Sequence, residues 1–174
     1  MIFSGLTAYA QEMVDVFVIT KDYKTDKKEG GVTVRILDGS TVVQSAVSPA
    51  NGKVSMQAPA GKVYKLEISK AGKVTRYATL NLKGVSSESI QGAGNVRTQD
   101  IPIGLFEELP NVDYSYVKSN PFTEFYFESG NPVLKYDDIV ADRMAKKIEK
   151  IIAESDAQKG QNDAKFNEAI KNAD

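Results

Sequence analysis

Hydrophobic and polar residues alternate over most of the chain up to residue 105, in short runs separated by turn sequences. A period of two is typical of β-strands that bury one face. The runs are separated by Asp38-Gly39, Asn51-Gly52 and Ala71-Gly72, where glycine permits the positive φ of a tight turn. The pattern predicts seven strands, at residues 13–20, 32–36, 41–47, 53–58, 64–68, 78–82 and 101–105.

Seven short strands at this spacing are typical of a β-sandwich. We therefore predict a mainly β protein whose principal unit is a seven-stranded antiparallel Greek-key β-sandwich over residues 11–109. Pro102 favours an edge position for the last strand, because proline cannot donate a hydrogen bond to a neighbouring strand.

The pattern changes after residue 109. Residues 110–136 hold a concentration of aromatic side chains, and 122–127 alternate well enough to form an additional strand. Residues 137–155 carry apolar side chains at helical spacing, which predicts an amphipathic helix capped by Asp137 or Asp138. Residues 156–174 are polar, and we expect a weakly ordered tail there.

The aromatic segment and the helix together form a possible contact surface. Aromatic and aliphatic side chains of this kind either bind a partner or pack the extension onto the sandwich, and the sequence leaves both alternatives open. The residues of this surface are Tyr114, Tyr116, Phe122, Phe125, Tyr126, Phe127, Met144, Ile148 and Ile151.

Several turn motifs resemble those of a known family. The runs Gly30-Gly31-Val32-Thr33-Val34, Pro49-Ala50-Asn51-Gly52 and Pro59-Ala60-Gly61-Lys62-Val63-Tyr64 occur in the order found in the carboxypeptidase regulatory-like domain. The resemblance covers residues 12 to 106. It implies a transthyretin-like (prealbumin-like) sandwich, an accessory role in exported proteins of Gram-negative envelopes, and no catalytic residues.

The first ten residues suggest export. An apolar run from Ile2 precedes Ala8-Tyr9-Ala10, a small-x-small pattern that resembles a signal peptidase site. The run is short and lacks basic residues, which is consistent with a truncated signal peptide, and a frayed terminus or part of a first strand is the alternative. We expect a periplasmic or secreted protein without a membrane span, because no later run approaches about 20 apolar residues.

Composition removes several kinds of chemistry. The chain has no His, Cys or Trp, so Ser-His and Cys-His nucleophile pairs and the usual zinc sites are excluded. A net charge of −1 gives no field for binding nucleic acid. The acidic pairs Glu107-Glu108 and Asp137-Asp138 lack the ligand spacing of an EF-hand. We predict no metal and no cofactor.

Three functions remain under consideration. The first is a non-catalytic envelope module that binds another envelope protein. The second is a domain that binds a small ligand or a carbohydrate, which would need a concave pocket with aromatic walls. The third is a hydrolase using carboxylates or a Ser-Lys pair, which would need two such groups in one cleft. We expect the first, and therefore a protein that is not an enzyme.

Overall fold

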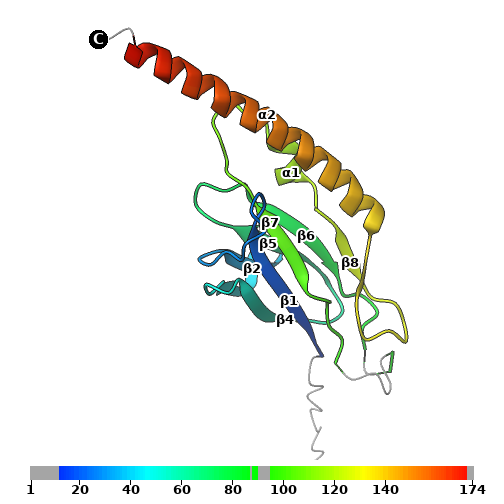
Figure 1. The fold of residues 1–174 in the computed structure, drawn as a ribbon. Helices are drawn as coiled ribbons and strands as arrows, with labels where there is room; N and C mark the ends of the chain where they lie inside the picture. Colours follow the sequence, from blue (N-terminus) through cyan, green and yellow to red (C-terminus); the bar gives the residue numbers. More distant parts are fainter. Residues whose placement is uncertain (1–11, 87, 90–94, 172–174) are drawn as a thin grey trace, which may run out of the picture.

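A computed structural model describes residues 12–86, 88–89 and 95–171 (Figure 1). The suggested signal peptide at 1–10 therefore lies outside the described residues. Within them the chain forms two β-sheets followed by helices. The strands are β1 (Met13–Asp22), β2 (Thr33–Asp38), β3 (Thr41–Val47), β4 (Lys53–Pro59), β5 (Val63–Ser69), β6 (Arg76–Asn81), β7 (Ile101–Leu105), β8 (Glu124–Tyr126) and β9 (Lys135–Tyr136).

The two sheets differ in size. One has three strands in the order β4-β1-β7, and the other has six in the order β3-β2-β5-β6-β8-β9. The described part thus contains nine strands rather than the predicted seven, because β8 and β9 extend the larger sheet. β8 lies within the alternating run at 122–127, whereas the two-residue β9 was not predicted.

The sheets are not purely antiparallel, which corrects the prediction. β1 pairs in parallel with β7, where Val18 lies opposite Ile101. β6 pairs in parallel with β8, where Leu80 lies opposite Phe125. Alternation in a sequence shows which face of a strand is buried, but the direction of its neighbour depends on how the connecting segments cross the fold.

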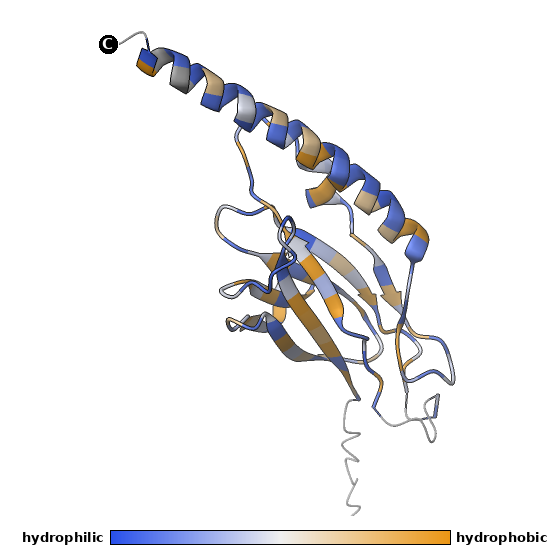
Figure 2. Ribbon diagram, viewed as in Figure 1, coloured by the Kyte–Doolittle hydropathy of each residue, from blue (hydrophilic) through white to orange (hydrophobic). Residues whose placement is uncertain are grey.

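The inner faces of the two sheets form the core. Val14, Val16 and Val18 of β1 are buried, and so are Leu66 and Ile68 of β5. The residues between them in the sequence, such as Phe17 and Glu67, are partly exposed. Each sheet therefore buries one row of side chains and turns the other row towards solvent. Figure 2 shows this alternation of apolar and polar residues along the strands.

One glycine fixes the crossing between the sheets. Gly52 connects β3 in the larger sheet to β4 in the smaller one and has φ of 69°. A Cβ at this position would lie 2.4 Å from the carbonyl oxygen of Thr20. The backbone approaches β1 so closely here that only glycine fits.

The described chain contains two helices, one between β7 and β8 and one after β9. The short helix α1 (Ser115–Ser119) precedes β8, and α2 (Asp138–Lys171) ends the described chain. Asp137 caps α2, because its Oδ1 accepts the backbone N–H of Val140 at 2.9 Å. α2 continues as a helix past residue 155, through the described part of the segment for which a weakly ordered tail was expected.

Helix α2 is longer than the sandwich that it crosses. Its 34 residues span about 50 Å, against about 33 Å for the ten residues of β1. It begins near β8, crosses one end of the sandwich and projects beyond it (Figure 1). Among the described residues, no helix is both long enough and apolar enough to cross a membrane.

Candidate interaction surface

Most of the predicted contact surface is inside the protein. Tyr114, Phe122 and Phe125 from the aromatic segment are buried, as are Met144, Ile148 and Ile151 from α2. Tyr116 and Phe127 are partly buried against the same core, and only Tyr126 is exposed. The aromatic segment and α2 thus pack onto the sandwich, which is one of the two alternatives that the sequence left open, and of the nine residues only Tyr126 is exposed.

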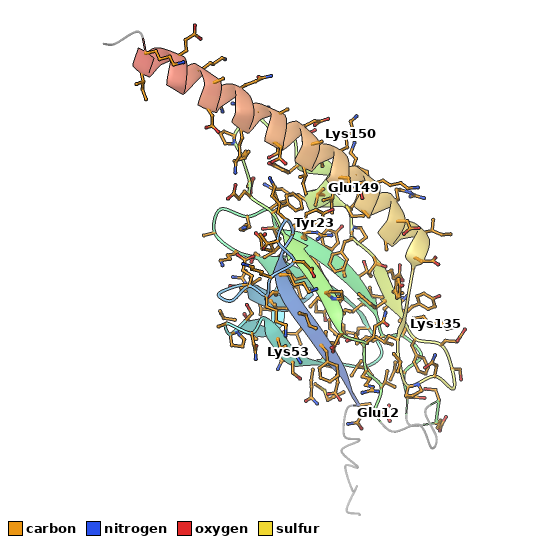
Figure 3. The ribbon with its side chains drawn as sticks, viewed as in Figure 1. Glu12, Tyr23, Lys53, Lys135, Glu149 and Lys150 are labelled. Atoms are coloured by element: carbon orange, nitrogen blue, oxygen red, sulfur yellow. The ribbon has the colours of Figure 1, made fainter. Side chains whose placement is uncertain are left out.

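The aromatic segment and α2 are buried because neither is stable without packing against the sandwich. An isolated helix is marginal in water, and most of its stability comes from packing its apolar face. Met144, Ile148 and Ile151 repeat at helical spacing, so they lie on the face that packs onto the sandwich. Glu149 and Lys150 on the intervening positions are exposed (Figure 3).

Ion pairs hold the middle of α2 against the sandwich. Asp156 pairs with Lys24, and Lys159 pairs with Glu107. The hydrogen bond from Lys159 lowers the pKa of Glu107. Gln158 also donates to the carbonyl oxygen of Asn111 at 3.0 Å. The side chains described farther along α2 are exposed, so the contact with the sandwich ends at about this turn.

Beside these ion pairs, Asp22 closes the end of β1. It accepts hydrogen bonds from the backbone N–H of Thr25 at 3.0 Å and from Lys73 Nζ at 3.1 Å. The bond from Thr25, followed by that from Lys73, lowers the pKa of Asp22 to about 2. The nearby hollow, which Glu107 and Ser155 also line, has a volume of about 100 Å³. Its acidic groups are paired with lysines, which is the arrangement of a structural contact.

Arg76 of β6 is a buried charge near α1. It is 9% exposed, its Nη1 donates to the carbonyl oxygen of Gly104 at 2.7 Å, and its guanidinium lies 5.2 Å from the centre of the Phe122 ring. Its Nε has no hydrogen-bond partner among the described residues. Burial lowers the pKa of Arg76 to about 10.

The carboxylates that line the hollow are engaged in ion pairs with lysines. Within the described ranges, no three His, Cys, Asp or Glu side chains are arranged to hold a metal ion. Glu107, Asp22 and Glu29 each face a lysine. This arrangement does not provide the pair of unlike carboxylates that the hydrolase hypothesis required.

β3, at one edge of the larger sheet, exposes a row of apolar side chains. In β3 six of the seven residues are exposed, and Ala46 is partly buried. Val42 is 49% exposed and Val47 is 63% exposed. β3 contains no charged residue, no proline and no glycine. Native proteins usually protect an edge strand with such residues, so β3 is open to pairing with another strand.

The hydrogen-bond pattern shows which backbone groups of β3 are free. The N–H of Ser48 donates to the carbonyl oxygen of Val32, and the carbonyl of Ser48 accepts from Gly31, so Ser48 points towards β2. Successive residues of an antiparallel strand point in opposite directions. The N–H and carbonyl groups of Ser45 and Val47 therefore point away from β2, towards the open side.

The outer edge of β4 is partly covered. Gln44 Oε1 accepts the N–H of Gln57 at 2.6 Å and so protects this part of β4. At the end of β7, the carbonyl of Leu105 accepts from Tyr23 within the β1–β7 pairing, and just beyond the strand the carbonyl of Phe106 accepts from Val74. A bulge at Val43, between the pairs Ile36–Gln44 and Leu37–Val42, is the single protective feature of β3.

A groove lies between β7, β8 and the start of α2. It has a volume of about 420 Å³, with walls that include Pro102, Phe122, Phe125 and Tyr136. Gln99 and Asp100 add polar groups to it. Its size and lining match the concave pocket that the ligand-binding alternative required.

Comparisons with known proteins do not place this chain in a family. No protein-family model matches the sequence, and no curated protein matches it. A crystal structure of the group B streptococcus pilus 2b backbone protein is similar over 53% of this chain and 40% of that chain, with 12% identity and a TM-score of 0.37. This chain thus spans less than half of that one. The carboxypeptidase regulatory-like resemblance stays a prediction.

The sequence contains one signal for an open edge at β3, its lack of charged residues. Residues 41–47 were predicted as a strand, but the absence of charge in that strand carries meaning only for an edge strand. Whether a strand is at an edge depends on the order of strands in the sheet, which local alternation does not give. The open edge of β3 is therefore recognised only from the order of the strands in the sheet.

Proposed function

We propose that this protein is a non-catalytic, exported module of the cell envelope that binds another polypeptide by strand addition at β3. The observation that carries the proposal is the open edge of β3, with outward-pointing backbone groups at Ser45 and Val47 and exposed valines on both sides of them. Strand addition uses main-chain hydrogen bonds for affinity and alternate side chains for specificity.

Two further features support a binding role. The ionisable groups near α2 are paired with one another, which suits a rigid scaffold. One face of α2 and most of the aromatic segment are covered by the protein itself. β3, in contrast, exposes its valines to solvent. The periplasmic or secreted location rests on the pattern at residues 8–10 and on the resemblance, so it is part of the proposal.

Photo-crosslinking in the native cells tests the proposal. A photoreactive amino acid at Val47 should give adducts with a second polypeptide in the envelope or secreted fraction. The same amino acid at Val63, an exposed residue of the interior strand β5, is the matched control and should give few adducts. A cytoplasmic location, or equal labelling at both positions, would contradict the proposal.

The groove favours a second candidate, a domain that binds a small ligand or a carbohydrate. Phe122 and Phe125 are buried in its wall, and Tyr136 is 45% exposed at its edge. An exposed aromatic ring beside amide and carboxylate groups is suited to stacking on a sugar. A glycan array with wild type and Tyr136→Ala distinguishes the candidates: hits that the substitution abolishes support this one, and an array without hits removes it.

A further inference from the structure

We propose that the strand that pairs with β3 is the β3 of a second copy of this chain, which gives a two-fold symmetric dimer centred on Ser45. This inference rests on the proposed role of β3 as a strand-pairing edge and adds the identity of the partner. The argument uses the direction of the free backbone groups, the side chains around Ser45 and the charge of the strand.

The backbone geometry selects the position of the two-fold axis. Ser45 and Val47 are the residues whose N–H and carbonyl groups point away from β2. Two antiparallel copies can place Ser45 opposite Ser45 of the second copy, where the two residues exchange a pair of N–H to carbonyl bonds. The larger sheets of both copies then continue into one another through β3.

This register makes the side chains self-complementary. With Ser45 on the axis, Val43 of each copy, the residue of the bulge, comes near Val47 of the other, and Gln44 lies opposite Ala46. Val43 is 39% exposed and Val47 is the most exposed valine of the described chain, so the pairing covers two apolar contacts of β-branched side chains. At the axis, the two serine hydroxyls can bond to each other.

Charge presents no obstacle to this pairing. β3 contains no charged residue, so no like charges meet across the axis. The chain has a net charge of −1, so two copies repel each other only weakly. A strongly charged partner strand would find no opposite charge on β3, whereas a neutral strand with β-branched residues can pack its side chains against those of β3.

The symmetry also limits the assembly. An interface that uses the same surface on both copies is closed, because each β3 edge is consumed by the other. The other long edge on this side, that of β4, is protected by Gln44. The expected species is therefore a dimer and not an open-ended polymer.

Analytical ultracentrifugation of the full chain tests the inference. Wild type should sediment as a dimer at micromolar concentrations, and Val47→Lys should sediment as a monomer because two lysines would then border the strand pair. Val63→Lys adds the same charge away from β3 and should remain a dimer. A monomeric wild type, larger polymers, or a Val47→Lys dimer would overturn the proposal.

Disulfide trapping tests the register without depending on the folding of Val47→Lys. The chain has no cysteine, so a disulfide in Ser45→Cys can form only between two copies. Paired residues that exchange backbone bonds have Cα atoms about 5.5 Å apart, which is within the range of a disulfide. Ser45→Cys should form a covalent dimer under mild oxidation, and Ser55→Cys, at an exposed position of β4, should not. The reverse result would overturn the register.

The two proposals fail in different ways. A monomeric chain whose Val47 photoadduct contains a different protein would overturn self-association and leave strand addition intact. A chain with no Val47 adduct in cells and no dimer in solution would overturn both.

Discussion

The side-chain oxygen of Gln44 accepts the backbone N–H of Gln57 at 2.6 Å and so joins the outer strands of the two sheets. Gln44 belongs to β3 and Gln57 to β4, and these strands are connected through Gly52. The bond closes the sandwich on the side where neither sheet has a further strand. One polar side chain therefore protects the edge of β4, while the edge of its own strand stays open.

Removing this bond should weaken the sandwich slightly. We expect Gln44→Ala to lower the free energy of unfolding by about 0.5–1 kcal/mol, because a typical hydrogen bond contributes about that much and the Gln57 N–H is accessible to water. Gln44→Glu keeps an acceptor oxygen and should cost less. Urea unfolding of the two variants checks this. Equal losses would indicate that the bond contributes nothing.

Substitutions on two faces of α2 test whether the predicted contact residue Ile148 is packed against the sandwich. Ile148 is 1% exposed against the sandwich, and Ile139, on the same helix, is 67% exposed. We expect Ile148→Ala to lower the free energy of unfolding by about 2–4 kcal/mol because it leaves a cavity. Ile139→Ala should change it by less than about 0.5 kcal/mol. Chemical denaturation followed by tyrosine fluorescence measures both, and an unaffected Ile148→Ala would contradict the packing of α2.

Asp22 should make the fold sensitive to acid. Its pKa in the folded protein is lowered from 3.8 to about 2, chiefly by the hydrogen bond from the Thr25 N–H. A carboxyl whose folded pKa is depressed adds stability above its unfolded pKa, and that stability is lost as the pH falls towards the folded value. The loss should therefore occur between about pH 4 and about pH 2.

Urea unfolding of Asp22→Asn over that pH range measures this contribution. The variant should be less stable than wild type near neutral pH, and the difference should shrink between about pH 4 and about pH 2. Asp26→Asn is the control, because Asp26 lies in the same loop and pairs with Lys21 instead. A difference between wild type and Asp22→Asn that is constant with pH would show that the charge of Asp22 is not involved.

Arg76 should contribute through its packing more than through its charge. Its guanidinium is buried against Phe122, no carboxylate of the described residues pairs with it, and burial lowers its pKa to about 10. Arg76→Met keeps a long apolar stem and removes the cost of burying the charge, so we expect it to change stability by less than about 1 kcal/mol. Arg76→Ala loses the stem and should cost about 2–3 kcal/mol. Thermal unfolding compares them, and equal destabilisation would assign the stability to the charge.

Local pattern predicted the strands well where a strand buries one face. Val14, Val16 and Val18 alternate in the sequence and are buried in β1, and Leu66 and Ile68 behave alike in β5. The same reasoning limited the cap of α2 to Asp137 or Asp138, since a capping carboxylate acts within one turn, and the structure selects Asp137. It did not extend to the end of α2, because residues 156–171 have weak apolar spacing although they continue a helix that is already packed and paired with the sandwich.

The sequence by itself determined which residues are apolar in alternation, where tight turns occur, and that histidine and cysteine chemistry is absent. Those properties are local, because they depend on side-chain type and on spacing of two or three to four residues. Only the tertiary structure decided that β1 pairs in parallel with β7, that the aromatic residues are covered by α2, and that β3 is an edge. These outcomes depend on which distant segments meet, and a segment's own sequence does not state its neighbours.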